Sequence, residues 1–68
     1  MNPLLLPWRT GRKLGRTVYA MLGPEASDSD PVLGMMDTRE LAAEVVATHN
    51  LVLRRWRRNV AAGGAGGE

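Results

Sequence analysis

Residues 37–58 read DTRELAAEVVATHNLVLRRWRR and decide the fold, because they form the one long segment with a helical period. At about 100° per residue, the apolar residues of this segment gather on one side and the polar residues on the other. We therefore predict an amphipathic helix that continues to about Arg58. Its apolar side comprises Leu41, Ala42, Val45, Thr48, His49, Val52 and Trp56, widened by Val46, Leu53 and Val60.

The start of this helix carries several agreeing signals. Asp37 is a favourable N-cap residue, and Glu40 stands three residues later, as in a capping box. Met36 and Leu41 have the spacing of a hydrophobic staple. Acidic residues early in the helix and arginines late in it also suit the helix dipole.

Asn50 leaves one alternative open within the helix. Asparagine tolerates the left-handed conformation, so it can end a shorter helix. In a continuous helix, Leu51 falls on the solvent side, where it would mark a contact surface. We favour the continuous helix.

The chain before the helix has the pattern of a β-hairpin. Residues 14–22 alternate at period two and include the β-favouring run Thr17 to Tyr19, which predicts a strand within Arg12–Leu22, bent near Gly11 or Gly15. The polar loop GPEASDSDP at 23–31 separates it from a second, antiparallel strand at Val32–Met36. Residues 4–6 are expected to form an extended arm against the core.

Length and composition add limits to this α+β (ββα) fold. The chain has 68 residues, which predicts one domain over 1–60 followed by a disordered glycine-rich tail over 61–68. So short a chain buries only about 60% of its unfolded surface, and without cysteine it has no disulfide to add stability. Self-association would supply the missing core, so we expect a homodimer.

Charge is segregated along the sequence although the net charge is only +2. Residues 1–23 carry bases and no acid, residues 24–37 carry acids and no base, and the helix ends in an arginine cluster. Such a pattern suits either binding to a polyanion or pairing within the chain. The candidate binding residues are therefore Arg12, Lys13 and Arg16, the helix-end residues Arg54, Arg55, Trp56, Arg57 and Arg58, and the exposed Leu51.

Two interpretations of the helix end compete. Arginines on phosphates with an aromatic residue among them are how small proteins hold nucleic acid, and the same cluster would also suit an anionic membrane surface or an acidic protein patch. Alternatively, the arginines form a solvated helix end and Trp56 packs inward, since it projects with Val45 and Val52. The early basic residues could extend the surface, or could pair with Glu25, Asp28 and Asp30.

The sequence offers no set of catalytic, metal-binding or cofactor-binding residues. His49 has no partner for general-base chemistry and is expected at the edge of the core. The glycines lack the spacing of a phosphate loop, and Asp28 and Asp30 lack the other ligands of a calcium loop. We therefore expect neither an enzyme nor a cofactor, and no small-molecule substrate. Since no apolar run spans a bilayer and no export signal is evident, a cytoplasmic location is the default.

Two motifs carry a resemblance to known proteins. GRTVY at 15–19, and GMMDT at 34–38 followed by ELA at 40–42, resemble a pattern in small proteins of actinobacteria and their phages. The resemblance covers roughly residues 8–50 and implies a strand–strand–helix unit from a phage or a bacterium, located in the host cytoplasm if a phage encodes it. No activity is attached to that group, so no functional residue carries over. This chain departs from the pattern in its extension LVLRRWRR at 51–58.

These observations predict a small non-enzymatic binding protein that engages a host protein or a second copy of itself. The alternative is a nucleic-acid-binding protein that uses the arginine-rich helix end and the basic N-terminal strand.

Overall fold

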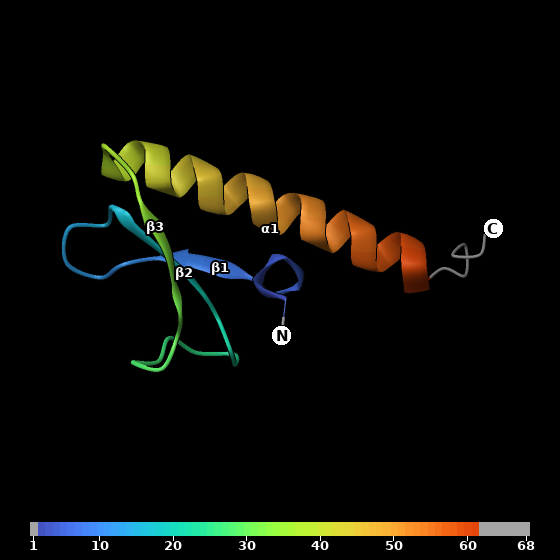
Figure 1. The fold of residues 1–68 in the computed structure, drawn as a ribbon. Helices are drawn as coiled ribbons and strands as arrows, with labels where there is room; N and C mark the ends of the chain where they lie inside the picture. Colours follow the sequence, from blue (N-terminus) through green and yellow to red (C-terminus); the bar gives the residue numbers. More distant parts are fainter. Residues whose placement is uncertain (1, 62–68) are drawn as a thin grey trace.

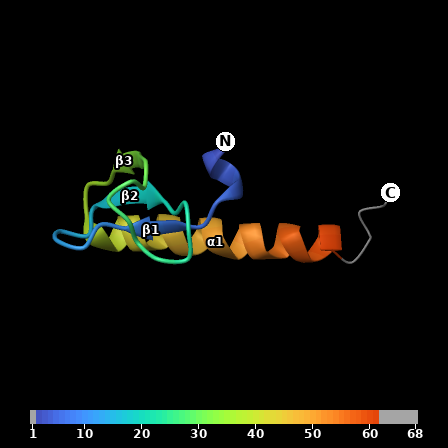
Figure 2. The same ribbon diagram turned by 90° about the horizontal axis from the view of Figure 1, so that it is seen from below.

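The computed structural model describes residues 2–61 and has an α+β fold in which one long helix packs against a three-stranded antiparallel sheet. The predicted tail over 61–68 lies, beyond residue 61, outside the described residues. The elements follow in the order η1 (Pro3–Leu5, a short 3-10 helix), β1 (Trp8–Thr10), β2 (Thr17–Ala20), β3 (Val32–Met35) and α1 (Arg39–Ala61). Figures 1 and 2 show that the C-terminal part of α1 extends past both the sheet and η1.

The predicted β2–β3 hairpin is confirmed, and the structure adds a third strand. β2 pairs antiparallel with β3, with an irregularity between Val18 and Tyr19. β1 pairs with the other edge of β2, so that Trp8 lies opposite Ala20. The strand predicted over 12–22 is shorter than expected, because only Thr17–Ala20 form β2 and residues 11–16 belong to the connection from β1. Gly15, with φ of +72°, takes the left-handed conformation within the turn between β1 and β2, where the strand path is interrupted.

The N-terminal segment also differs from the prediction. Residues 4–6 do not form an extended arm, because Pro3–Leu5 make one 3-10 turn. The side chain of Asn2 accepts a hydrogen bond from the backbone N–H of Leu4 at 2.9 Å and caps this turn. Proline at the first helical position is compatible with such a start, since it has no N–H to leave unpaired.

The helix is continuous from Arg39 to Ala61, so Asn50 does not break it. Its N-cap is Thr38, and the prediction of Asp37 was wrong. The Thr38 hydroxyl accepts a hydrogen bond from the backbone N–H of Leu41 at 3.0 Å, and the Thr38 carbonyl accepts the first helical bond from Ala42. Glu40 therefore stands one position too early for a capping box.

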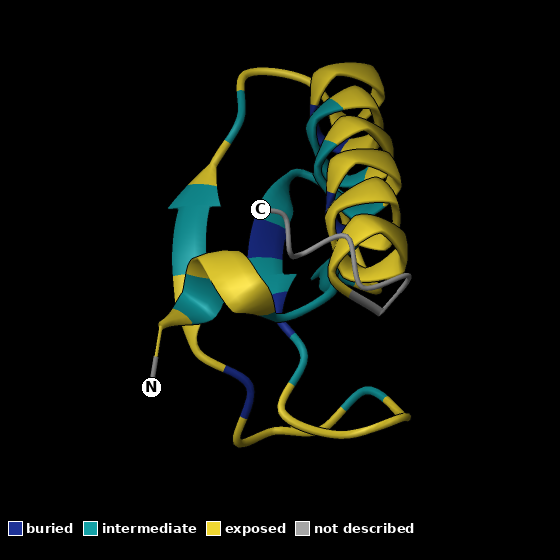
Figure 3. Ribbon diagram, turned by 90° about the vertical axis from the view of Figure 1, so that its right-hand side faces the viewer, coloured by how far each residue is buried: buried dark blue, intermediate teal, exposed yellow. Residues whose placement is uncertain are grey.

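The core lies between β2 and α1 (Figure 3). Val18 and Ala20 point from β2 to the helix, which contributes Ala42 and Leu53 as its buried residues. The buried line of α1 is thus Ala42, Val46, His49 and Leu53, of which Val46 and His49 are half-buried. The apolar side predicted from the sequence was too wide, because the sheet is short and covers only this line.

Candidate functional site

A cluster of polar contacts joins β1 and η1 to the middle of α1. The Asn50 side chain accepts a hydrogen bond from Trp8 N at 2.8 Å and donates one to Trp8 O at 3.0 Å. Asn50 thereby occupies the backbone groups at the free edge of β1, as a neighbouring strand would. The Trp8 indole donates to the Pro3 carbonyl at 3.0 Å and so holds η1 in place.

His49 belongs to this cluster and has a structural role. Its ring stacks on Trp8, with 3.6 Å between ring centroids and 9° between planes. Nε2 of His49 lies 2.8 Å from the Leu6 carbonyl oxygen. Because a carbonyl oxygen only accepts hydrogen bonds, Nε2 is the ring nitrogen that carries a hydrogen and donates it. The prediction of a histidine at the edge of the core agrees with this position.

Asp30 is the buried charged residue of the described chain and holds the 23–31 loop. Arg9 donates to it at 2.9 Å, while the backbone N–H groups of Ser27 and Leu22 donate at 3.1 and 3.2 Å. Arg9 also lies over the Tyr19 ring at 4.3 Å. Of the predicted pairings between early basic residues and loop acids, this one forms.

The hydrogen bond from Arg9 lowers the pKa of Asp30, as do those from Leu22 and Ser27, and burial opposes them less strongly. A carboxylate whose pKa is lowered in the folded state stabilises the fold at pH values above its ordinary pKa of about 3.9. That stability is lost as the pH falls through the pKa that the carboxylate has in the folded state. We expect urea denaturation to show a steep loss of stability below about pH 4. The variant Asp30→Asn should flatten this dependence, whereas the exposed Asp28→Asn should keep it.

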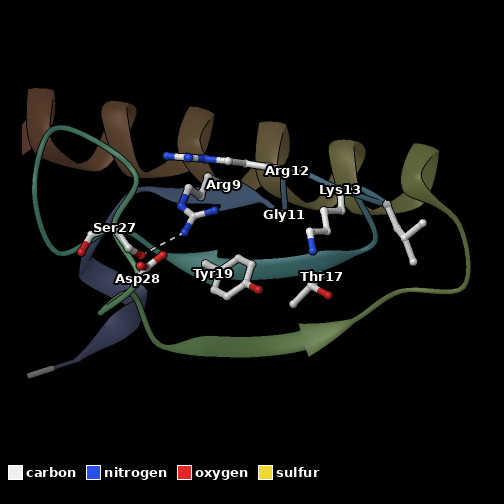
Figure 4. A pocket seen from close by; sticks show the side chains of 10 residues that line it. Arg9, Gly11, Arg12, Lys13, Thr17, Tyr19, Ser27 and Asp28 are labelled. Carbon is white, nitrogen blue, oxygen red and sulfur yellow. Dashed lines mark hydrogen bonds between the residues drawn. The ribbon is translucent and has the colours of Figure 1, made fainter.

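A hollow of about 530 Å³ lies on the sheet face opposite the helix (Figure 4). Tyr19 and Thr17 of β2 line it together with Arg12 and Lys13 of the β1–β2 loop. Arg9 also lines it, but Arg9 is already bound to Asp30 and to the Ser27 carbonyl. The basic groups of the hollow that have no carboxylate partner within residues 2–61 are therefore Arg12 and Lys13.

The structure separates the two predicted basic blocks. The β1–β2 loop lies at the N-terminal end of α1, because a Cβ on Gly15 would lie 3.3 Å from Cβ of Arg39. At 1.5 Å per residue, Arg54–Arg58 lie about 22–28 Å further along the helix. The two blocks therefore do not form one continuous surface.

Two of the candidate arginines bind the protein itself. Arg16 Nε donates to the Met36 carbonyl at 3.0 Å and connects β2 to the residues before the helix. Arg57 donates to the Leu5 carbonyl at 3.0 Å and holds η1. Arg54, Arg55 and Arg58 are exposed and have no carboxylate partner within residues 2–61.

An apolar surface of α1 lies largely uncovered beside the buried line, with Val45 half-buried and its other residues exposed. We call Leu41, Val45, Val52 and Trp56 the apolar strip. Each of them precedes by one residue a position that faces the sheet or η1, so the strip is rotated about 100° round the helix axis from the buried line. Val52 is 58% exposed and Trp56 is 50% exposed. Trp56 thus does not pack fully inward, contrary to one of the two interpretations. Leu51 is also exposed and lies on the solvent side of the strip.

The apolar strip borders a groove formed with η1. The groove has a volume of about 290 Å³ and is lined by Leu4, Leu5, His49, Val52, Leu53 and Trp56. Leu4 is 60% exposed and Leu5 is 46% exposed. The structure therefore assembles one apolar surface from two segments nearly fifty residues apart, and the sequence gives no pattern that relates them.

No family model, curated protein or solved structure was found to match the chain. The resemblance to actinobacterial and phage proteins therefore stays a prediction. No helix within the described residues is long and apolar enough to cross a membrane. Residues 2–61 also contain no cluster of three or more His, Asp or Glu side chains placed to hold a metal ion.

Proposed function

We propose that this protein is a non-enzymatic protein-binding module that binds its partner through the apolar strip of α1 and the adjoining η1 groove. The observation that carries the proposal is the half-exposed Trp56 beside Val52, Leu4 and Leu5. Contiguous exposed apolar groups mark interaction sites, and tryptophan is enriched among the residues that dominate binding energy. A long helix that presents one apolar line is suited to helix-in-groove recognition.

The use of the polar side chains supports a binding role over catalysis. His49 is engaged in stacking and in the bond to Leu6, and Asp30 is engaged by Arg9 and two backbone N–H groups. These groups stabilise the fold and present no free acid–base pair to a substrate. A host protein or a second copy of the chain, in the cytoplasm of a bacterium or phage-infected cell, remains the expected partner.

Site-specific photo-crosslinking tests this proposal in the cells that express the gene. A photoreactive amino acid at Val52 lies in the apolar strip, while the same group at the exposed Ala47 lies on the opposite side of the helix. We expect a discrete covalent adduct from position 52 and none from position 47. Equal yields at both positions, or no adduct at either, would contradict the proposal.

Nucleic-acid binding is the second candidate, and the exposed Arg54, Arg55 and Arg58 favour it. Binding to short DNA duplexes should then weaken with salt, with log K falling by about 0.9 per phosphate neutralised for each unit of log salt. Reversing these three charges to glutamate should abolish binding, whereas Arg12→Glu at the far end should leave it nearly unchanged. Absence of binding at low salt rejects this candidate.

A further inference from the structure

We propose that the occupant of the apolar strip is a second copy of this chain, with the two α1 helices packed antiparallel. This inference rests on the proposed function and names its partner. The evidence lies in the spacing of the strip, in the distribution of charge beside it and in the small core of the single chain.

The spacing of the strip suits packing against another helix. Leu41, Val45 and Val52 of the strip, with Thr48 between the two valines, follow one another at intervals of four, three and four residues, which is the repeat of a helix-pairing seam. The interval from Val52 to Trp56 is again four. In an antiparallel pair centred near Thr48, Val45 of one copy lies beside Val52 of the other, and Leu41 lies beside Trp56.

The charges beside the strip select the antiparallel orientation. Glu40, Glu44, Leu51 and Arg55 each precede a residue of the strip, so they form the next line round the helix, on the side away from the sheet. This line is acidic at its N-terminal end and basic at its C-terminal end, where Arg58 adds to Arg55. Antiparallel helices place the acids of each copy beside the arginines of the other, whereas parallel helices place like charges together.

This side of the helix is exposed in the single chain, and covering it would add to a small core. Figure 3 shows the sheet on one side of α1, with the opposite side of the helix exposed. Among the described residues, the buried hydrophobic side chains are Val18, Ala20, Ala42 and Leu53. A domain of this size with so few buried groups usually needs a disulfide, a bound metal or self-association to be stable. This chain has no cysteine with which to form a disulfide.

Charge reversal in the purified full-length chain tests the arrangement. One variant reverses both acids, Glu40→Arg with Glu44→Arg, and the other reverses both arginines, Arg55→Glu with Arg58→Glu. Each variant alone places like charges together in an antiparallel homodimer. We expect the dimer dissociation constant of each, measured by sedimentation equilibrium, to rise at least about tenfold over that of the natural chain. A 1:1 mixture of the two variants restores complementary charges and should return to the dimer mass.

The matched control for the arginine reversal is Arg12→Glu with Arg54→Glu, which makes the same change in net charge at exposed positions away from the strip. It should leave the dissociation constant within about threefold of the natural value. Recovery in the mixture also shows that each variant is folded. A natural chain that is monomeric at all accessible concentrations overturns the inference, as does a dimer that neither variant weakens.

The same data separate this inference from the proposed function. A monomeric purified chain whose position 52 crosslinks to a different protein in cells refutes the second copy as occupant and leaves the binding module intact. A monomeric chain with no crosslink at position 52 refutes both. Binding of the chain to DNA without self-association would instead favour the arginines as the functional groups.

Discussion

Replacing Asn50 with alanine should lower the free energy of unfolding by about 2–3 kcal/mol. The substitution removes both hydrogen bonds to Trp8 and leaves a donor and an acceptor at the edge of β1 without their partners. A net hydrogen bond contributes about 0.5–1.5 kcal/mol, and an unpaired, partly buried polar group adds about 1–3 kcal/mol of cost. The higher helix propensity of alanine offsets about half a kilocalorie per mole of this loss.

Urea denaturation followed by circular dichroism measures this effect, and Asn59→Ala is the control. Asn59 lies in the same helix and is exposed, so its replacement makes the same chemical change without breaking contacts to β1. The control should change the free energy of unfolding by less than about 0.5 kcal/mol. Equal losses for the two variants would show that Asn50 does not hold β1 to the helix.

Replacing Leu53 with alanine should cost about 2–5 kcal/mol, which is a large fraction of the stability of a domain this small. Leu53 is 6% exposed and is the largest buried side chain of α1 among the described residues. Its truncation loses buried apolar surface and leaves a cavity between α1, η1 and the sheet. Because the described core holds few other large groups, little repacking can compensate.

Leu14→Ala is the matched control for Leu53→Ala, because it deletes the same atoms from a side chain that is 70% exposed. Thermal and urea unfolding at the lowest workable concentration keep the contribution of self-association small. The control should stay within about 0.5 kcal/mol of the natural chain. A Leu53→Ala variant that is equally stable would contradict the assignment of the core to this line of α1.

The helix and the β2–β3 hairpin were predictable because their signals are local. The 3.6-residue period of 37–58, the alternation near Thr17–Tyr19 and the polar loop at 23–31 each depend on neighbours in sequence. The position of the N-cap was wrong by one residue, because Asp37 and Thr38 are both good capping residues and only the backbone path distinguishes them.

β1 and the contact cluster around it could not be predicted, because both depend on residues far apart in sequence. Trp8–Thr10 is three residues long between Pro7 and Gly11, too short to show alternation. Asn50 was considered as a helix breaker, whereas its side chain reaches Trp8, 42 residues away. An asparagine in mid-helix is a weak helix former, and that is the one signal in the sequence that its side chain has another role.

The candidate surface was predictable in part. The exposure of Leu51 and of the helix-end arginines agrees with the sequence, since both follow from the helical period. The hydrogen bonds from Arg16 and Arg57 to backbone carbonyls do not follow from the helical period, because these bonds depend on where β2 and η1 lie. For the same reason, the sequence could not distinguish the part of the apolar side that the sheet covers from the strip that it leaves open.

The most direct test of the central claim is the reactivity of a cysteine placed in the apolar strip. The chain has no cysteine of its own, so Val52→Cys and Ala47→Cys each introduce a single thiol at an exposed position of α1. We predict that a thiol-reactive maleimide labels position 52 several-fold more slowly in expressing cells than in dilute purified protein, while position 47 reacts alike in both. Equal labelling of position 52 in the two settings would contradict the claim that another protein chain covers the strip.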